Sequence, residues 1–267
     1  ELDINNPQLP DFIVPGADEK KQDEPAKIKV IGVGGGGGNA VNHMYHQGIG
    51  GVSFVLCNTD AQALRNSPVP VKVQLGAKGE GAGNIPEVAK KLAEESAAEV
   101  EALFDDNTRM AFITAGMGGG TGTGAAPVVA RIAKEKGVLT VGIVTIPFLF
   151  EGEPKILQAF AGVEEMRKHV DALLVINNER LCKIYPDLSW TTAFAKADDS
   201  LSNAARSIAE LVSKDGKINL DFADVRTTLK DGGAAVISTG SGEGEHRMSR
   251  AIQNALTSPL LKESDIY

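Results

Sequence analysis

Ala115-Gly-Met-Gly-Gly-Gly-Thr-Gly-Thr-Gly124 is the stretch of sequence that decides the fold of this chain. It lies between an apolar run typical of a β-strand, residues 110–114, and a helical pattern over residues 127–136. Glycine is costly in backbone entropy, so six glycines in this stretch indicate that backbone amides close on a ligand. A helix N-terminus beside them offers unpaired N–H groups and a partial positive charge, which suit phosphate. Because proline is tolerated in a first helical turn, Pro127 supports this helix start, and the stretch predicts a phosphate-binding loop.

Length and composition indicate a soluble globular protein, and Cys57 and Cys182, each within an apolar stretch, favour reduced thiols in the cytoplasm over a disulfide. The 267 residues allow one large domain or two smaller ones, and 42% hydrophobic and 23% charged residues are ordinary for such a protein. A net charge of −8 argues against a nucleic-acid partner, whose binding surface is normally basic. No apolar run approaches the roughly 20 residues that span a bilayer, so we expect no direct membrane insertion. The polar, acidic start of the sequence shows no secretion signal.

Strand and helix patterns alternate along most of the chain. Apolar runs predict strands at residues 27–33, 52–57, 71–75, 110–114, 138–144 and 172–176. Helical spacing and helix boundaries predict helices between them, at residues 40–47, 86–103, 127–136 and 154–169. This alternation predicts an α/β fold with a doubly wound, mostly parallel sheet. Glycine-rich loops at residues 34–39, 76–83 and 115–124 follow strands, so they should converge at the carboxyl edge of the sheet, where such folds bind ligands.

The chain divides into four predicted segments. Residues 1–26 lack periodicity and predict a disordered arm, and residues 27–188 form a nucleotide-binding domain. Residues 189–216 predict one long central helix, with a buried stripe of Ala193, Phe194, Ala197, Leu201, Ala204, Ile208 and Leu211. Residues 217–267 supply a loop, one strand and two helices, which cannot close a second sheet, so we expect a truncated second domain.

Two classes of nucleotide site compete for the first glycine loop. Gly32 to Gly37 satisfy the G-x-G-x-x-G pattern of dinucleotide-binding folds, with Asp60 near the position of a ribose-binding acid. This signal is weak, because consecutive glycines satisfy many patterns. The sequence contains no G-x-x-x-x-G-K-[ST], so a P-loop is excluded. A second glycine loop, residues 116–124, favours a triphosphate ligand. The alternative function is a dinucleotide-dependent oxidoreductase. If the glycine loops bind no ligand, each is only a tight turn.

Several motifs together resemble the tubulin/FtsZ GTPase family, from Lys27 to the end of the chain. They are Gly116-Met-Gly-Gly-Gly-Thr-Gly-Thr-Gly124, Ile31-Gly-Val-Gly-Gly-Gly-Gly-Gly-Asn-Ala-Val41, Asn58-Thr-Asp-Ala-Gln-Ala-Leu64, Phe150-Glu-Gly152 and Asn219-Leu-Asp-Phe-Ala-Asp-Val-Arg226. The resemblance implies a protein that binds GTP or GDP, with Mg²⁺ beside GTP, and hydrolyses GTP. It also implies a head-to-tail homopolymer that forms the bacterial division ring at mid-cell, with division-ring accessory proteins binding through C-terminal regions that this sequence lacks.

The resemblance assigns the nucleotide site residue by residue. The expected nucleotide-binding residues are Gly34, Gly35, Gly36, Gly37, Gly38, Asn39, Asp60, Gly81, Ala82, Gly83, Gly118, Gly119, Gly120, Thr121, Gly122, Thr123, Glu151, Lys155, Asn178, Phe194 and Asp198. Residues 79–83 resemble the segment that senses the γ-phosphate, and Glu151 matches a ribose-contacting acid. Lys155 stands where the family usually has arginine, so a compact ammonium group replaces a planar guanidinium that could make a bidentate contact. Asn178 and Asp198 match guanine-reading positions, and a carboxylate suits the N1–H and N2–H groups of guanine.

Two of these assignments keep an alternative. Asp60 either holds a Mg²⁺-bound water or caps its own loop. Asp198 is either a base reader or an exposed helix acid. No protein-bound metal site is expected, because His43 and His46 lie three residues apart without a third ligand.

Asn219, Asp221 and Asp224 are the catalytic residues that the resemblance implies. Along the predicted long helix they lie roughly 25 Å or more from Asp198. They therefore act on a nucleotide of the next subunit in a head-to-tail stack, which grows into a filament. Helix capping is the alternative role for the two aspartates. We expect this chain to bind nucleotide but to polymerise and hydrolyse GTP poorly, and a nucleotide-binding scaffold without turnover is the further alternative.

Overall fold

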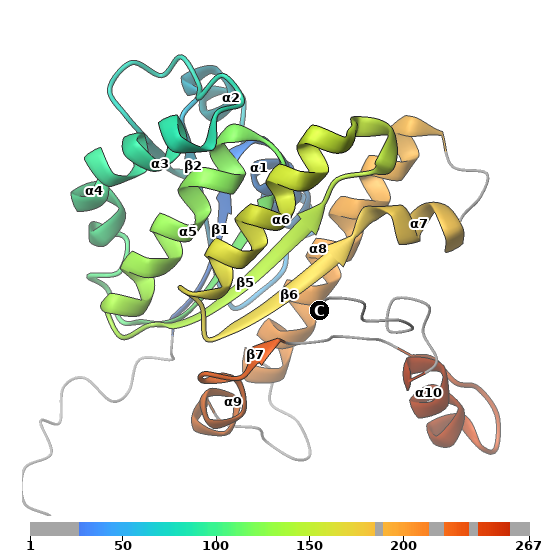
Figure 1. The fold of residues 1–267 in the computed structure, drawn as a ribbon. Coiled ribbons are helices and arrows are strands. Elements are labelled where there is room, and N and C mark those ends of the chain that lie inside the picture. The colour runs from blue at the N-terminus through green and yellow to red at the C-terminus, as the bar shows by residue number, and fades with distance from the viewer. Residues whose placement is uncertain (1–26, 185–188, 214–221, 235–239, 257–267) are drawn as a thin grey trace, which may run out of the picture.

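The computed structural model describes residues 27–184, 189–213, 222–234 and 240–256 and is built on a seven-stranded sheet (Figure 1). The strands are β1 (Lys27–Val33), β2 (Val52–Asn58), β3 (Val71–Gln74), β4 (Thr108–Gly116), β5 (Leu139–Ile146), β6 (Ala172–Asn177) and β7 (Gly233–Ala234). They are ordered β3-β2-β1-β4-β5-β6-β7, and every neighbouring pair is parallel. The predicted doubly wound α/β fold is therefore confirmed, while the predicted arm at residues 1–26 lies outside the described residues.

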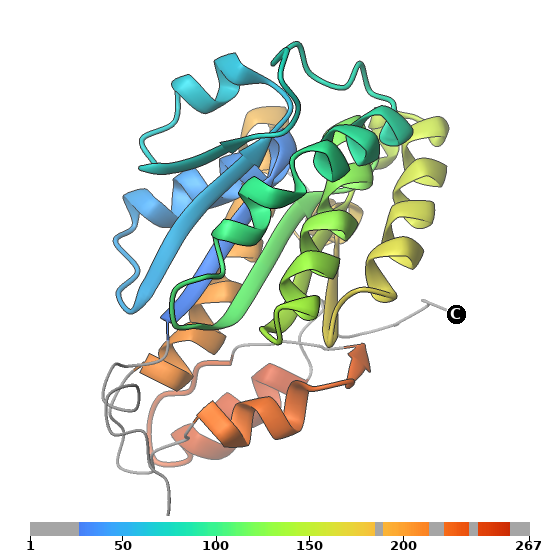
Figure 2. The same cartoon turned by 90° about the vertical axis from the view of Figure 1, so that its left-hand side faces the viewer.

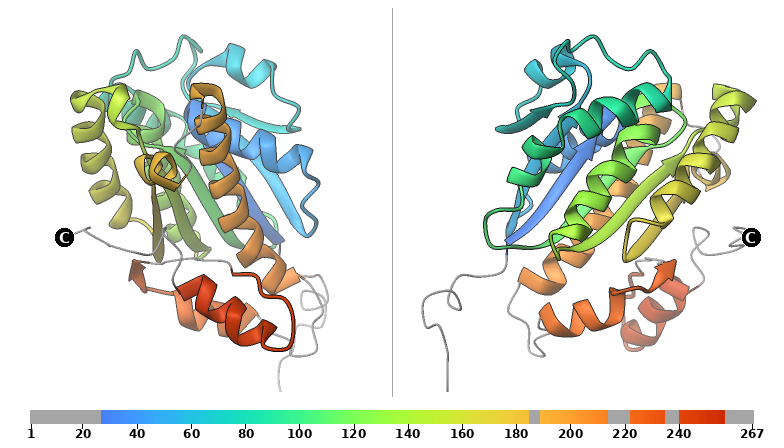
Figure 3. Two further views of the ribbon diagram at one scale, coloured as in Figure 1. Left: turned by 90° about the vertical axis from the view of Figure 1, so that its right-hand side faces the viewer. Right: turned by 60° about the vertical axis from the view of Figure 1, so that its left-hand side comes forward.

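Helices cover both faces of the sheet. They are α1 (Gly34–His46), α2 (Ala61–Arg65), α3 (Pro86–Glu95), α4 (Ala97–Ala102), α5 (Gly120–Glu135), the 3-10 helix η1 (Leu149–Glu151), α6 (Glu153–Arg167), α7 (Asn178–Ile184), α8 (Trp190–Ser213), α9 (Phe222–Leu229) and α10 (Arg247–Leu256). The two panels of Figure 3 show α1 and α8 crossing one face and α3 to α6 covering the other. Figure 2 shows the sheet between these two layers. No helix in the described ranges is both long and apolar enough to cross a membrane.

Successive strand residues alternate between two hydrophobic cores. On β1, Ile28 and Val30 join the core beneath α1 and α8, whereas Ile31 and Val33 join the core beneath α3 to α6. Every residue of β5 is buried, as expected for a parallel strand covered on both faces. These two cores hold the strands in register.

The register brings the motif-bearing strand ends together. Val33, the last residue of β1, pairs with Cys57 on β2 and with Ala115 on β4. From these neighbouring positions the chain continues into α1, the 58–60 turn and the 116–119 loop. The predicted convergence of glycine segments at the carboxyl edge of the sheet is confirmed.

Two helices begin earlier than the sequence pattern predicts. The structure starts α1 at Gly34 rather than at Ala40, and it starts α5 at Gly120 rather than near Pro127. Pro127 lies inside α5, so its interpretation as a first-turn proline is wrong. The glycine runs thus supply the first helical turns instead of loops that precede the helices.

Close backbone packing explains why these helical turns are made of glycine. A Cβ atom on Gly37 would overlap the carbonyl of Thr114, and one on Gly122 would overlap the carbonyl of Gly116. Glycine is a poor helix former, at about 1 kcal/mol per residue relative to alanine. Here it is the residue that lets a helix start directly on the end of a strand.

The helix predicted over residues 86–103 is instead the separate pair α3 and α4. Ser96 lies between them, and its Oγ accepts a hydrogen bond from the Gly76 N–H at 2.9 Å. Ala89 and Ala93 are buried on α3, whereas Val88 is 40% exposed. Small side chains face the core here because α3 approaches α5 closely.

The buried stripe of α8 is confirmed in its small residues but not at Phe194. Ala193, Ala197, Leu201 and Ala204 are buried, whereas Phe194 is 44% exposed. Its ring lies against other phenylalanines near the carboxyl edge of the sheet, which removes it from the core stripe. The predicted burial of residues 208 and 211 concerns side chains outside the described set.

The segment after α8 lies at the opposite edge of the sheet (Figure 1). Gly233 of β7 pairs with Ala172, the first residue of β6. Lys134, near the end of α5, forms ion pairs with Asp171 at 3.2 Å and with Asp231 at 3.3 Å. These contacts attach the α9–β7 segment to the amino ends of the strands.

Replacing Gly124 with alanine tests the close approach of α3 to α5. A Cβ on Gly124 would overlap the carbonyl of Pro86, the first residue of α3. We expect Gly124→Ala to lower the free energy of unfolding by about 3 kcal/mol, as overpacking does, measured by urea denaturation. Gly50→Ala is the control, since no atom lies within 4 Å of its Cβ position; equal stability of the two variants would contradict this packing.

Candidate nucleotide-binding site

Two helix N-termini meet at the carboxyl edge of the sheet. The first turns of α1 and α5 touch, because a Cβ on Gly34 would lie 2.8 Å from the amide nitrogen of Gly122. The capping residues of the two helices, Val33 and Gly119, form no side-chain cap bond, which leaves the first N–H groups for another acceptor. Two positive helix ends at one place favour a ligand with more than one phosphate.

The glycines of α1 divide between packing and exposure. Gly34 and Gly37 are buried, whereas Gly35, Gly36 and Asn39 are exposed. No atom lies within 4 Å of the Cβ position of Gly35. The exposed residues therefore form the side of the turn that a phosphate can reach.

Threonine hydroxyl groups hold the loop that leads into α5. The Gly118 N–H donates to Thr123 Oγ1 at 2.9 Å, and Thr121 Oγ1 lies 2.7 Å from Thr59 Oγ1. Gly118 has a φ of 97°, which favours glycine. Sequence reasoning does not single out Thr59, which is only 1% exposed, although it lies within the 58–64 motif. Thr123 and Thr59 thus shape the loop from behind.

The loop at residues 79–83 joins the same edge. The Gly81 N–H donates to the Thr59 carbonyl at 3.0 Å, and the Ala61 N–H donates to the Gly79 carbonyl at 3.1 Å. The segment predicted to sense a terminal phosphate therefore lies beside the turn that follows β2. All three glycine segments named from the sequence come together.

Asp60 caps a helix. Its Oδ1 accepts hydrogen bonds from the Gln62 N–H at 2.8 Å and the Ala63 N–H at 3.2 Å, at the start of α2. Of its two interpretations, loop capping is the role that these contacts show. Across the described ranges, no group of three or more His, Cys, Asp or Glu side chains could hold a metal ion. Mg²⁺ at this site would take its ligands largely from phosphate oxygens and water.

An aromatic cluster lies at the end of β5 and on α8. The rings of Phe148 and Phe150 stack with centroids 4.9 Å apart, and Phe194 lies edge-on to Phe148 at 5.2 Å. Asp198 follows Phe194 by one helical turn, so both residues occupy one side of α8. The cluster offers a flat apolar surface beside a carboxylate, which suits a nucleobase.

Asn178 carries an unsatisfied buried oxygen. It is the first residue of α7, it is 4% exposed, and its Oδ1 has no hydrogen-bond partner in the structure as described. Buried side-chain oxygens are nearly always hydrogen-bonded, and Thr114 Oγ1 and Ser202 Oγ share this lack of a partner, but Asn178 directly follows the carboxyl end of β6, where a ligand could supply the donor. A purine with N–H groups on its edge supplies such a donor, and the site therefore fits a guanine base.

Burial perturbs the carboxyl group of Asp198. Desolvation raises its pKa to about 6 from an ordinary 3.8; His43 nearby lowers the pKa and Asp199 raises it. His43 Nε2 lies 2.7 Å from Asp199 Oδ1, which links α1 to α8. Asp198 is therefore half-buried and costly to ionise, which does not fit its alternative interpretation as an exposed helix acid.

Glu151 and Lys155 interact with each other and with the local backbone. Glu151 Oε1 accepts from the Phe148 N–H at 3.0 Å, and its Oε2 lies 3.4 Å from Lys155 Nζ. The ion pair joins η1 to the first turn of α6 and leaves Lys155 half exposed. A single ammonium group thus points from α6 where a guanidinium would offer a bidentate contact.

Of the predicted catalytic residues, the one that the structure describes, Asp224, does not join this site. Asp224 lies on α9, at the edge of the sheet opposite the glycine turns (Figure 1). The other two predicted residues, Asn219 and Asp221, lie outside the described residues. The structure thus groups the phosphate- and base-binding candidates and separates Asp224 from them.

Comparison with known families identifies the architecture. The model of the Tubulin/FtsZ family, GTPase domain, matches residues 27–186. The chain belongs to the tubulin/FtsZ family. This tubulin/FtsZ chain is 66% identical over 247 residues to the cell division protein FtsZ of Porphyromonas gingivalis, covering 91% of this chain and 54% of that protein. It therefore spans about half the length of that relative.

Solved structures of the tubulin/FtsZ family share this fold. An FtsZ dimer from M. jannaschii, described as empty, superposes with a TM-score of 0.84 at 45% identity, covering 90% of this chain and 71% of that chain. A GDP-bound CetZ1 monomer from Haloferax volcanii superposes with a TM-score of 0.66 at 26% identity, covering 78% of this chain and 65% of that one.

Asp198 gives stability a pH dependence. Its folded-state pKa, about 6, exceeds the ordinary 3.8, so the folded state binds more protons and stability falls as pH rises from about 4 to 6. We expect Asp198→Asn to be more stable than the parent chain at pH 7 and equally stable at pH 4, measured by urea denaturation without nucleotide. A constant difference between Asp198→Asn and the parent across this range would contradict the prediction.

Proposed function

We propose that this chain is the guanine-nucleotide-binding part of a GTPase that acts in bacterial cell division. The observation that carries the proposal is the meeting of two glycine-built helix N-termini at one edge of the sheet, with the unsatisfied oxygen of Asn178 also at that edge. Membership in the tubulin/FtsZ family and the GDP-bound state of a related CetZ1 support GTP and GDP as ligands.

In this proposal the phosphates lie between the two glycine turns. Free N–H groups at the starts of α1 and α5, within residues 34–39 and 119–122, bind the α-, β- and γ-phosphates, with Gly118 shaping the turn, and residues 81–83 respond to the γ-phosphate. Mg²⁺ bound to the phosphates would neutralise charge that develops during phosphoryl transfer. Glu151 contacts the ribose, and Lys155 supplies a point charge beside the phosphates.

The base is read by Asp198 and Asn178 against the ring of Phe194. An ionised carboxylate accepts from guanine N1–H and N2–H together, whereas adenine presents no such pair of donors. Since burial already disfavours the charged form of Asp198, its two hydrogen bonds to guanine recover part of that cost. Binding should therefore weaken as pH falls through about 6.

Hydrolysis is proposed to occur between subunits. Asp224 lies far from the nucleotide edge of its own chain, and the P. gingivalis relative is a cell division protein. The solved FtsZ from M. jannaschii is a dimer. We therefore propose head-to-tail self-association, with Asn219, Asp221 and Asp224 of one subunit polarising a water beside the nucleotide of the next, at the division site in the cytoplasm.

A thermal-shift experiment tests the nucleotide class. GTP or GDP at about 100 times its dissociation constant should stabilise the chain by about 2.7 kcal/mol and raise Tm by about 5 °C or more, whereas NAD should not. Gly35→Asp should abolish this shift, because it places a carboxylate at an exposed, open position in the phosphate seat. Gly35→Ala is the matched control and should keep most of the shift. Protection by NAD alone would favour the dinucleotide-dependent oxidoreductase.

A mixing experiment tests the composite site in a protein that spans the full length of its relatives. Gly35→Asp should fail to bind GTP, and Asp221→Ala should bind GTP but not hydrolyse it. In a random head-to-tail stack of equal amounts, about a quarter of interfaces place the nucleotide of an Asp221→Ala subunit against the intact Asp221 of a Gly35→Asp subunit. Turnover should return at these interfaces. Phosphate release measures this recovery. A mixture as inactive as its components, or loss of GTP binding by Asp221→Ala alone, would contradict the composite site.

A further inference from the structure

Gln158 on α6 bridges two separate loops at the nucleotide edge. Its Nε2 donates to the carbonyl of Gly118 at 3.0 Å and to the carbonyl of Asn84 at 3.4 Å. The first carbonyl belongs to the loop before α5, and the second belongs to the loop before α3. One amide group therefore sets the distance between the two loops.

Both loops have backbone that needs external support. Asn84 has a φ of 63°, a conformation that non-glycine residues rarely adopt, and Gly118 has a φ of 97°. The loops also touch, since a Cβ on Gly120 would lie 2.8 Å from the Ile85 nitrogen. A small shift of either loop would therefore be transmitted to the other.

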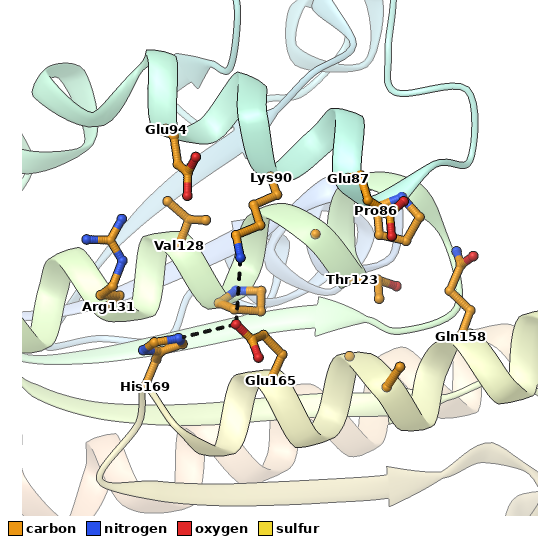
Figure 4. A pocket seen from close by; sticks show the side chains of 14 residues that line it. Pro86, Glu87, Lys90, Glu94, Thr123, Val128, Arg131, Gln158, Glu165 and His169 are labelled. Atoms are coloured by element: carbon orange, nitrogen blue, oxygen red, sulfur yellow. Dashed lines mark ion pairs between the residues drawn. The ribbon is translucent and has the colours of Figure 1, made fainter.

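The bond from Gln158 to the loop before α3 crosses the mouth of a cavity. A cavity of about 620 Å³ lies among α3, α5 and α6, with Gln158 and Thr123 in its lining. Figure 4 shows Gln158 on the α6 side and Pro86 on the α3 side of this cavity. Farther along, Lys90 of α3 and Glu165 of α6 form a long ion pair of 3.8 Å. The cavity separates α3 from α6. Near the loops, Gln158 connects α6 to the residues just before α3.

The bond to Gly118 also fixes the direction of a neighbouring donor. In a trans peptide the C=O and N–H groups point in opposite directions. Because Gln158 holds the Gly118 carbonyl toward α6, the Gly119 N–H points away from α6. Gly119 is the capping residue of α5, where free N–H groups face an anion.

We propose that Gln158 is a positioning residue that sets the two phosphate loops relative to each other and thereby favours a nucleoside triphosphate over the diphosphate. This inference rests on the proposed function. A diphosphate requires the glycine turns alone, whereas a γ-phosphate requires the 81–85 and 118–122 segments at a fixed separation. Gln158 acts through these backbones and does not touch the ligand itself.

Affinities of this chain for GDP and for a slowly hydrolysed GTP analogue test the proposal. Gln158→Leu removes the donor at similar size, and Gln158→Asn keeps the amide on a shorter side chain. We expect both to bind the GTP analogue about tenfold more weakly, as loss of a hydrogen bond worth about 1.4 kcal/mol would do, with GDP affinity changed less than twofold. Gln158→Lys keeps a donor and should restore binding of the triphosphate. Titration calorimetry measures both ligands.

Two controls separate positioning from other effects. Leu157→Lys adds the same positive charge as Gln158→Lys, at a neighbouring side chain that is 61% exposed. If charge alone raises the affinity for the GTP analogue, Leu157→Lys should raise it as well. Without nucleotide, Gln158→Leu should unfold only about 2–4 °C below the parent chain, as the loss of about 1 kcal/mol predicts, so both proteins are folded in the titrations. An unchanged ratio of GTP-analogue to GDP affinity in both Gln158→Leu and Gln158→Asn would overturn the proposal. If the parent chain bound neither nucleotide, the proposed function would fail instead.

Discussion

Contact between glycine turns and strand ends, backbone against backbone, is the constraint on which this site depends. Gly37 lies on the carbonyl of Thr114, and Gly122 lies on the carbonyl of Gly116. Any side chain at either position would push its helix away from the sheet and separate the two N-termini. Glycine weakens the helix locally, and the rest of α1 offsets this by burying Ala40, Val41 and Met44. Anion-binding geometry is thus maintained by hydrophobic packing one turn farther along the helix.

Much of this arrangement could be predicted from the sequence, because strands and the glycine segments that follow them are marked by neighbouring residues in the chain. Apolar runs marked the strands, and the common direction of the strands placed every glycine segment at one edge. The starts of α1 and α5 could not be predicted, because glycine has a low helix propensity, and only the structure shows that the carbonyls of Thr114 and Gly116 leave no room for a larger residue. The position of Phe194 could not be predicted for a similar reason. Helical spacing alone predicts that it is buried in the core, whereas its ring packs against Phe148 and Phe150 at the site.

Positioning residues leave no pattern in one sequence. Gln158 is an ordinary polar residue on a helix, and its two partners are carbonyl groups 40 and 74 residues away. Thr59 is similar, since its hydroxyl partner on Thr121 lies 62 residues away. Glycine runs can be recognised in a sequence because they are typical of phosphate-binding turns. The side chains that support such turns cannot, because their identity depends on which loops meet in the folded chain. Such residues emerge only when the backbone is known.

The geometry of the sheet limits how a second copy can complete the site. Helix α8, at about 1.5 Å per residue, separates the nucleotide edge from the α9 edge by roughly 30 Å or more. A two-fold symmetric dimer that joined two chains end to end would bring two nucleotide edges together, or two α9 edges. Among end-to-end contacts, a head-to-tail contact is the one that brings Asp224 of one chain to the glycine turns of another. Under the proposed function, a repeating stack is therefore the arrangement in which catalysis and assembly use the same interface.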